Sequence, residues 1–146
     1  MATVELREIT KETVRSVLKV ETTDEQRNFV APTAVSIAQA HFEPKAWFRA
    51  IYADDEPVGF VMLFDDAETP EYYLWRLLIG AEHQRMGYGR AAMEQVVAYV
   101  RTRPAATELL TSWVPKPGGP EDFYRGLGFV PTGEVDGGEV VARLVL

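Results

Sequence analysis

The sequence predicts a mixed α/β domain in which strands and helices alternate along the whole chain. Short apolar runs of strand length are bounded by turn residues, and one longer segment has apolar residues at helical spacing. No linker, repeat or low-complexity tract divides the chain. A length of 146 residues with 47% apolar side chains suits a single domain, residues 1–146, with a buried core.

The first half of the chain is expected to form a strand, two helices and three further strands. Thr10 is a candidate helix cap, Pro32 suits the start of a second helix, and residues 54–57 (Asp-Asp-Glu-Pro) are typical of a turn between paired strands. The run from Tyr72 to Ile79 is apolar except for Arg76, as expected of a central strand. The expected elements are a strand at 4–9, helices at 10–22 and 32–43, and strands at 47–53, 58–64 and 72–79.

The second half contains the clearest helix. Apolar residues from Ala92 to Val100 recur at helical spacing, and Pro104 ends the pattern. Pro120 suits the first turn of a short helix that Gly128 ends. The expected elements are a helix before Pro104, a strand at 108–114, a helix at 121–127, and strands at 129–135 and 139–146 around the turn Asp136-Gly137-Gly138. The complete order is β-α-α-β-β-β-α-β-α-β-β.

The net charge of −7 is confined to the first half of the chain. Residues 1–73 carry 14 acidic and 7 basic side chains, whereas residues 74–146 carry 8 of each. An acidic surface repels phosphate backbones, so we expect no nucleic-acid partner. The acidic half is either a surface that attracts a cationic ligand or simply a solvated one.

Cysteine is absent, which excludes a disulfide framework, a thiolate metal site and a cysteine nucleophile. The two histidines, His41 and His83, form no paired metal-ligand motif, so no metal cofactor is expected. No segment has about 18 uninterrupted apolar residues, and the N-terminus lacks the apolar core of a leader. We therefore expect a soluble, cytoplasmic protein with no membrane partner.

The most informative stretch runs from Leu77 to Arg90. It has the pattern of a buried strand, a turn with Gly87 and Gly89, and the start of a helix. Such a junction directs several unpaired backbone N–H groups to one point, where the helix dipole also favours negative charge. With Arg85 and Arg90 beside it, the turn is a candidate cradle for a phosphate or pyrophosphate, although the same junction can also serve packing alone.

Two common nucleotide-binding motifs do not fit this stretch. The chain has no G-x-x-x-x-G-K-[ST] string of a Walker loop. A dinucleotide fingerprint needs a third glycine where Ala92 stands, and it needs a βαβ unit in place of the hairpin expected before the turn.

Two motifs in this order resemble those of the GCN5-related N-acetyltransferase (GNAT) family. Residues 84–89 (Gln-Arg-Met-Gly-Tyr-Gly) match its Q/R-x-x-G-x-G/A signature, between the expected strand and helix. Residues 123–129 (Phe-Tyr-Arg-Gly-Leu-Gly-Phe) resemble its L-Y-x-x-x-G-F motif. The order of elements agrees over nearly the whole chain, so the resemblance implies a single GNAT-like domain with a splayed central sheet.

The resemblance implies that acetyl-CoA is the co-substrate. Its pyrophosphate would rest on backbone N–H groups of residues 85–90, and its pantetheine arm would pair with residues 77–79 in the gap beside the strand at 108–114. The cofactor-binding residues so implied are Leu77, Leu78, Ile79, Gln84, Arg85, Met86, Gly87, Tyr88, Gly89 and Arg90. Tyr124 would be catalytic and give a proton to the departing CoA thiolate; the alternative is an aromatic ring that packs beneath the cofactor.

The chain departs from the family pattern at two places. Pro117 stands where many members have an asparagine, so the resemblance does not extend to cofactor contacts from the 115–120 loop. Residues 74–77 (Leu-Trp-Arg-Leu) stand where some members have a glutamate general base. By chemistry alone, the candidates for a base are Glu21, Asp24, Glu25 and Glu82.

Direct attack of a bound primary amine on the thioester is the expected mechanism, because the chain has neither a cysteine nor a Ser-His-Asp pattern. Backbone N–H groups near Ile79 would stabilise the oxyanion, as the family resemblance suggests. Residues 58–60, 75–79, 128–134 and 138–141 are similar to stretches of bacterial spermine/spermidine acetyltransferases, which implies a polyamine acceptor.

An acidic first half fits a polycation as the small-molecule partner. Candidate ligands for its ammonium groups are Asp65, Asp66, Glu68 and Glu71, with Glu21, Asp24 and Glu25. The alternatives are an enzyme that acetylates an aminoglycoside or a protein amine, and a non-catalytic module that binds acyl-CoA. A homodimer is an expectation from the family, with the apolar strand at 140–146 as a candidate contact.

Overall fold

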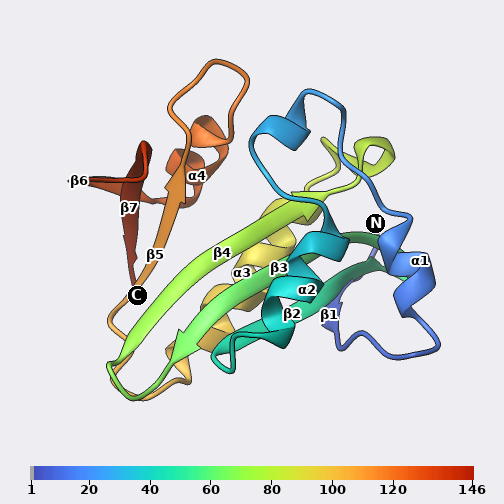
Figure 1. Ribbon diagram of the computed structural model, residues 1–146, viewed down its shortest axis with the longest axis horizontal. Coiled ribbons are helices and arrows are strands. Elements are labelled where there is room, and N and C mark those ends of the chain that lie inside the picture. Colours follow the sequence, from blue (N-terminus) through green and yellow to red (C-terminus); the bar gives the residue numbers. More distant parts are fainter. Residues whose placement is uncertain (1) are drawn as a thin grey trace.

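The architecture is one mixed sheet with helices on both faces, and the computed structural model describes residues 2–146 of it (Figure 1). The strand order is β1-β2-β3-β4-β5-β7-β6. The strands are β1 (Val4–Arg7), β2 (Ala46–Ala53), β3 (Glu56–Asp66), β4 (Glu71–Ile79), β5 (Glu108–Trp113), β6 (Val130–Asp136) and β7 (Glu139–Val145). The helices are α1 (Val14–Leu18), α2 (Thr33–His41), α3 (Tyr88–Arg101) and α4 (Glu121–Leu127), with the 3-10 turns η1 (Gln26–Asn28) and η2 (Ala81–His83). The predicted fold class and the predicted order of strands and α-helices are confirmed.

The first helix differs from its prediction. The hydroxyl of Thr10 accepts a hydrogen bond from the N–H of Thr13 at 3.3 Å and so caps the turn that precedes α1, but α1 ends at Leu18 rather than near residue 22. The chain then forms η1, because the side chains of Thr23 and Gln26 each accept a hydrogen bond from the other's backbone N–H, at 3.2 and 3.3 Å. This reciprocal arrangement is a capping box, which starts a new helical turn.

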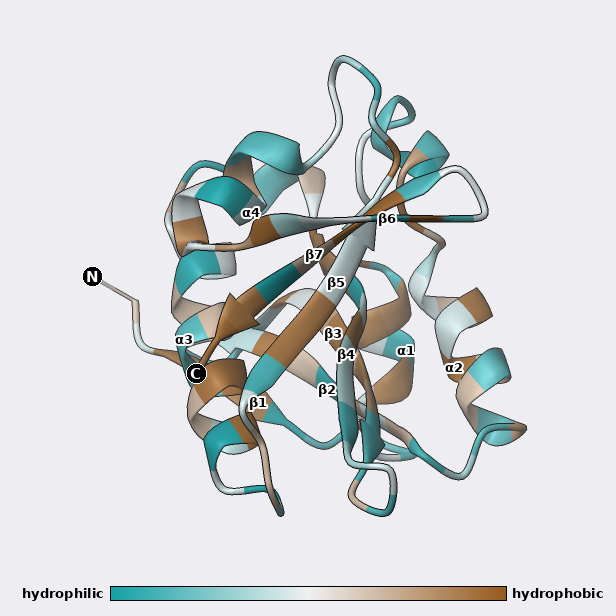
Figure 2. Ribbon diagram, turned by 90° about the vertical axis from the view of Figure 1, so that its left-hand side faces the viewer, coloured by the Kyte–Doolittle hydropathy of each residue, from teal (hydrophilic) through white to brown (hydrophobic). Residues whose placement is uncertain are grey.

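Two layers of helices cover the sheet, with α1 and α2 on one face and α3 and α4 on the other (Figure 2). The predicted apolar stripe of α3 is buried, with Ala92, Met93, Val96 and Val100 facing the main core. On the opposite face, Phe60, Met62 and Leu78 pack beneath α2 and the segment that precedes it. Within residues 2–146, no helix has the length and apolar character needed to cross a bilayer.

The sheet is continuous on one side of β4 and open on the other. β3 and β4 are antiparallel and paired from Gly59↔Ile79 to Asp66↔Glu71, with one bulge that leaves Trp75 without a partner. β4 and β5 are parallel and share a single pair, Tyr73↔Leu110. Beyond this pair the two strands diverge (Figure 1). This divergence is the splayed central sheet that the family resemblance implied.

The C-terminal strand lies inside the sheet. β7 pairs with β5 on one side and with β6 on the other, so β6 is the edge strand. A homodimer contact through β7 would therefore have to use the face of the strand, because both of its backbone edges are occupied. The oligomeric state stays a prediction.

Gly59 supports the close approach of β3 and β4, which we expect a single methyl group to disrupt. A Cβ at Gly59 would lie 2.3 Å from the carbonyl oxygen of Leu78 and 2.9 Å from Cδ1 of Ile79. Gly59→Ala should lower the free energy of unfolding by about 1–3 kcal/mol, as overpacking in a core does. Urea denaturation measures this change.

Gly126→Ala is the matched control. Gly126 is in α4, has no positive φ, and its Cβ would meet only Nη2 of Arg90 at 3.9 Å. Alanine should stabilise this helical position by about 0.5–1 kcal/mol. A Gly59→Ala protein as stable as the wild type would contradict the packing of β3 against β4.

Candidate active site

The gap between β4 and β5 is bounded at both ends by side-chain hydrogen bonds to β4. The hydroxyl of Thr111 on β5 donates to the carbonyl of Leu74 at 3.3 Å, close to where the strands part. At the wide end, Nε2 of Gln84 donates to the carbonyl of Ile79 at 2.9 Å. Between these points residues 75–78 of β4 have no paired residue on β5. An extended ligand can bind here as an added strand, because the backbone groups of β4 face an open position.

The glycine turn lies at the wide end of the gap. Its backbone reverses through two residues in the left-handed region, Arg85 with φ of 64° and Gly87 with φ of 83°. The N–H groups of residues 85–90 have no carbonyl acceptor within residues 2–146, and the next N–H, that of Ala91, donates to the carbonyl of Gly87 at 3.0 Å. These N–H groups at the start of a 14-residue helix, α3, are suited to an anion.

The side chain of Gln84 holds the turn in shape. Besides Ile79, its amide exchanges two hydrogen bonds with the amide of Gln26 in η1, at 2.6 and 3.0 Å. The segment around η1 also reaches the 115–120 loop, because a Cβ at Gly119 would lie 3.0 Å from the ring of Phe29. η1 therefore bridges the two sides of the gap at its open end (Figure 1), a link that the sequence analysis missed. The Thr23-x-x-Gln26 capping box was the signal that could have located it.

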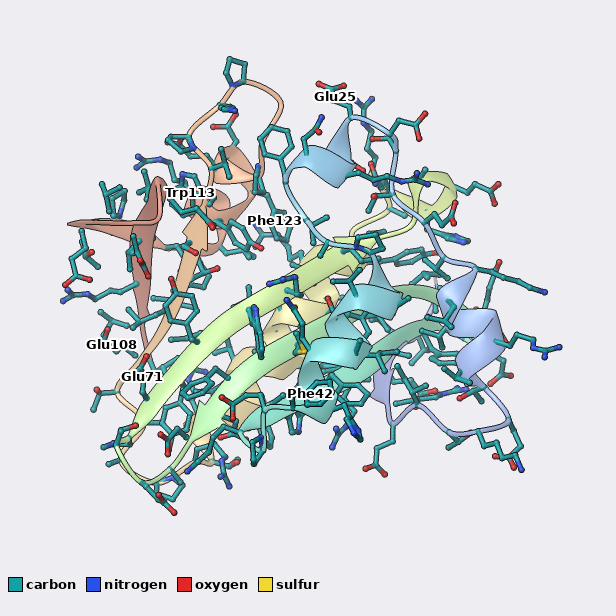
Figure 3. The ribbon with its side chains drawn as sticks, viewed as in Figure 1. Glu25, Phe42, Glu71, Glu108, Trp113 and Phe123 are labelled. Carbon is teal, nitrogen blue, oxygen red and sulfur yellow. The ribbon has the colours of Figure 1, made fainter. Side chains whose placement is uncertain are left out.

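Tyr124 approaches the gap from the face of α3 and α4. Its side chain is 6% exposed and stacks on Trp113, with ring centroids 5.9 Å apart. Burial raises the pKa of Tyr124 well above its ordinary value, and the neighbouring hydroxyl of Thr111 opposes the shift only partly. A phenol with the ordinary pKa is already protonated at neutral pH, and burial keeps that of Tyr124 protonated at more alkaline pH as well. Figure 3 shows Phe123, the neighbour of Tyr124, between the diverging strands.

Arg76 lies on the opposite face, towards α2. The bulge at Trp75 makes Trp75 and Arg76 face the same way, and Nη2 of Arg76 donates to Oε1 of Gln39 on α2 at 3.0 Å. Nε of Arg76 is buried and has no hydrogen-bond partner. Burial lowers the pKa of Arg76, and the negative charge of Glu139 opposes this shift.

A second polar group on the α2 face joins the two sides of the gap. Ser112 on β5 donates a hydrogen bond from Oγ to Oε1 of Glu139 at 3.1 Å. Burial raises the pKa of Tyr73 on β4, an effect that the Ser112 hydroxyl opposes and that the charges of Glu139, Asp136 and Glu71 reinforce. Tyr73, Ser112 and Glu139 are far apart in sequence, so nothing in their spacing indicated that they would meet.

The acidic residues considered as bases do not gather at the gap. Glu21 and Asp24 form ion pairs with Arg27, at 3.2 and 3.7 Å. Glu82 is exposed in η2. Glu25 lies over the 115–120 loop, where a Cβ at Gly118 would be 2.8 Å from its Oε1.

Most of the acids considered as ammonium ligands are neutralised by the chain's own cations. Asp65 pairs with Arg103 at 2.9 Å. Lys45 pairs with both Asp66, at 2.9 Å, and Glu68, at 3.3 Å. These pairs lie at the end of β4 opposite the glycine turn, next to Glu71 (Figure 3). The structure therefore does not bring this predicted set together with Tyr124.

Comparison with known families decides the class of protein. The model described as "Acetyltransferase (GNAT) family" matches residues 5–129, which is most of the chain. The chain belongs to the GNAT acetyltransferase family. Enzymes of this family are acyltransferases that use acetyl-CoA. A search of curated proteins finds no match. Within residues 2–146, no group of three or more His, Cys, Asp or Glu side chains is placed to hold a metal ion.

Solved structures share the fold at low sequence identity. An acetyltransferase from Thermus thermophilus is 20% identical, with all of both chains covered and a TM-score of 0.77. The PaiA N-acetyltransferase from Thermoplasma acidophilum, in complex with coenzyme A, is 15% identical over 99% of each chain, with a TM-score of 0.74. An acetyltransferase from Salmonella typhimurium that modifies the N-terminal serine of ribosomal protein L7/L12 is 12% identical, covers 100% of this chain and 96% of that one, and has a TM-score of 0.74. At these identities the likeness establishes the fold alone.

A Cβ at Gly87 should weaken acetyl-CoA binding, because it would project into the open space before the turn and force alanine into the left-handed region. Gly87→Ala should raise the dissociation constant at least about tenfold, equivalent to about 1.4 kcal/mol. Isothermal titration calorimetry measures this constant.

Gly133→Ala provides the control for backbone strain. Gly133 has φ of 96° in β6, and its Cβ would also meet no atom within 4 Å. Both variants should lose about 1–2 kcal/mol of stability from the left-handed backbone, but only Gly87→Ala should bind acetyl-CoA less tightly. Equal affinities in the two variants would contradict an anion site at the glycine turn.

Proposed function

We propose that this chain transfers an acetyl group from acetyl-CoA to a primary amine that attacks the thioester directly. The observation that carries the proposal is the gap beyond the single β4–β5 pair, with the protonated phenol of Tyr124 beside it. The pantetheine arm would pair with Leu77, Leu78 and Ile79. The pyrophosphate would rest on the N–H groups of residues 85–90, while the Gln84 side chain keeps the turn in shape.

The proposed reaction needs one proton donor and one proton acceptor. The neutral amine nitrogen bonds to the thioester carbon, the C–S bond breaks, and the sulfur takes the proton of the Tyr124 phenol. The amine nitrogen loses a proton to a base, and water returns a proton to the phenolate. Backbone N–H groups near Ile79 are the proposed donors to the oxyanion. Tyr124 in its matching motif favours an enzyme over a non-catalytic acyl-CoA-binding module.

A polyamine such as spermidine or spermine is the proposed acceptor. The resemblance of residues 58–60, 75–79, 128–134 and 138–141 to polyamine acetyltransferases supports it. On the α2 face, Glu71, Asp136 and Glu139 lie near enough to Tyr73 to act on its pKa, so negative charge surrounds this side of the gap. Aminoglycosides and protein amines are the alternative acceptors. We also propose a cytoplasmic enzyme, for which a homodimer is an expectation from the family.

Spermidine and spermine should each release CoA from acetyl-CoA in the presence of the protein, with saturation at millimolar concentration or below. A thiol-reactive dye measures the release, with an aminoglycoside, a peptide beginning with serine and glutamate as comparison acceptors. Release with another acceptor but with neither polyamine would overturn the polyamine assignment. Calorimetric binding of acetyl-CoA without turnover of any amine would overturn the enzyme.

Replacing Tyr124 with phenylalanine should slow turnover far more than it weakens cofactor binding. Loss of a positioned acid costs about 100-fold or more in kcat, whereas the acetyl-CoA dissociation constant should change less than about threefold. Burial raises the pKa of Tyr124 above 10, the ordinary pKa of a phenol. Between pH 7 and 10 the wild-type enzyme should therefore lose no activity through ionisation of Tyr124. Steady-state kinetics over this pH range and calorimetry make the comparison.

Tyr72→Phe is the control for this substitution. The phenol of Tyr72 is also buried, but it donates to the carbonyl of Pro104 at 2.6 Å, at the other end of β4. Its loss should affect stability and leave kcat unchanged. An unchanged kcat in Tyr124→Phe would refute the role of proton donor.

A further inference from the structure

Glu139 and Tyr124 reach the gap from opposite faces of the sheet. On β5, Thr111 and Trp113 are buried on the α3 and α4 face, next to Tyr124. Ser112 lies between them in sequence, so its side chain points to the other face, where it donates to Glu139. A thioester held in the gap would have the phenol on one side and the Glu139 carboxylate on the other.

We propose that Glu139 binds the acceptor's ammonium group and removes its proton before attack, with Ser112 as the residue that positions it. The assignment rests on the proposed amine acetyltransferase function and supplies a base that converts the bound ammonium group to the neutral amine that the reaction needs. Neither Glu139 nor Ser112 was a candidate in the sequence analysis.

Glu139 differs from Glu21, Asp24, Asp65, Asp66 and Glu68, each of which pairs with a cation of the chain. Across residues 2–146 it forms no ion pair, and its side chain has one hydrogen bond, from the neutral hydroxyl of Ser112 to Oε1. That bond occupies one of about four lone-pair positions of the carboxylate, so the others remain open to an ammonium group. Glu139 is only partly exposed, so its attraction for a cation is less screened than at a solvated position.

Of the charged groups around Glu139, the acids favour binding of an ammonium group, whereas the Arg76 guanidinium favours removal of its proton. Arg76 and Tyr73 face it from β4, with Glu71 further along that strand, and Asp136 faces it from β6. The Arg76 guanidinium is occupied by Gln39 and by the carbonyl of Trp75, to which Nη1 donates at 3.2 Å. Its positive charge disfavours a second cation nearby, which lowers the pKa of an amine held between it and Glu139.

The proposed step is balanced in protons and electrons. The alkylammonium gives one proton to the Glu139 carboxylate and becomes a neutral amine. The amine's lone pair forms the C–N bond as the C–S bond breaks, and the sulfur takes the proton of the Tyr124 phenol. The nitrogen's remaining excess proton goes to water, which in turn reprotonates the phenolate. Glu139 then returns its proton to solvent, so the net products are the acetamide, CoA thiol and one proton.

Glu139→Gln tests the proposal, because the amide oxygen can still accept from Ser112 while the charge and the basicity are lost. At pH 7.5, kcat/KM for spermidine should fall about 100-fold or more, with the affinity for acetyl-CoA unchanged. The variant can use only amine that is already neutral, so its kcat/KM should rise about tenfold per pH unit up to the amine pKa near 10. The wild-type profile should be flatter over this range, because Glu139 can take the proton of an amine that binds as the ammonium ion.

Glu134→Gln is the matched control. Glu134 is exposed and lies on β6 of the same hairpin. Its replacement by glutamine changes the net charge of the protein by the same amount. Its kinetics and pH profile should equal those of the wild type. Ser112→Ala should lower kcat/KM about three- to tenfold without the steep pH dependence, because the carboxylate remains but is less well positioned.

Two further results separate the possible failures. Where Glu139→Gln does not fold, as judged by thermal unfolding, Glu139→Asp keeps the charge and should give reduced activity with the wild-type pH profile. Glu139→Gln kinetics within twofold of Glu134→Gln at every pH would overturn the role of Glu139 and leave the acetyltransferase intact. A wild-type protein that acetylates no amine would overturn both.

Discussion

The single residue pair between β4 and β5 is the constraint on which the rest of the site depends. Two neighbouring strands in the middle of a sheet normally satisfy each other's backbone groups, and an internal edge left open is costly unless something occupies it. Here β4 pairs with β3 from Glu71 to Ile79 except at the Trp75 bulge, so it remains a strand without β5 beyond Tyr73. Side chains satisfy its carbonyls at both ends, from Thr111 to Leu74 and from Gln84 to Ile79. The open segment between them has the length and polarity to accept an extended ligand.

The alternation of side chains along β5 gives the two faces of the gap different chemistry. Thr111 and Trp113 help to bury Tyr124, and that burial keeps its phenol protonated. Ser112 faces the other side, where polar side chains of β4 and β7 meet. The bulge at Trp75 adds to this contrast, because it turns Arg76 towards α2 within an otherwise apolar strand. The Tyr124 phenol and the Glu139 carboxylate thus lie on opposite faces of the sheet.

Local patterns were enough to predict most of the fold, because each element carries its own signal. The stripe from Ala92 to Val100 and the turn Asp136-Gly137-Gly138 fall where they were expected, and so do the glycine turn and Tyr124. The early end of α1 was missed because Thr23 and Gln26 cap a new turn in competition with the helix. Tyr73, Ser112 and Glu139 were beyond sequence reasoning for a different reason. Their meeting depends on the register of three strands, which no local spacing encodes.

The net charge of −7 does not indicate an acidic surface that binds a cationic ligand. Arg27, Lys45 and Arg103 neutralise Glu21, Asp24, Asp65, Asp66 and Glu68 locally, and exposed or partly exposed pairs of this kind contribute little to the attraction of a ligand. A cationic ligand is attracted most by an acidic side chain that forms no ion pair and loses part of its hydration on folding. Glu139 meets both conditions beside the gap, and the Arg76 guanidinium, whose pKa it affects, is hydrogen-bonded to Gln39 and to the carbonyl of Trp75. Selection for an amine therefore depends on where ion pairs are absent, more than on how many acidic residues the chain contains.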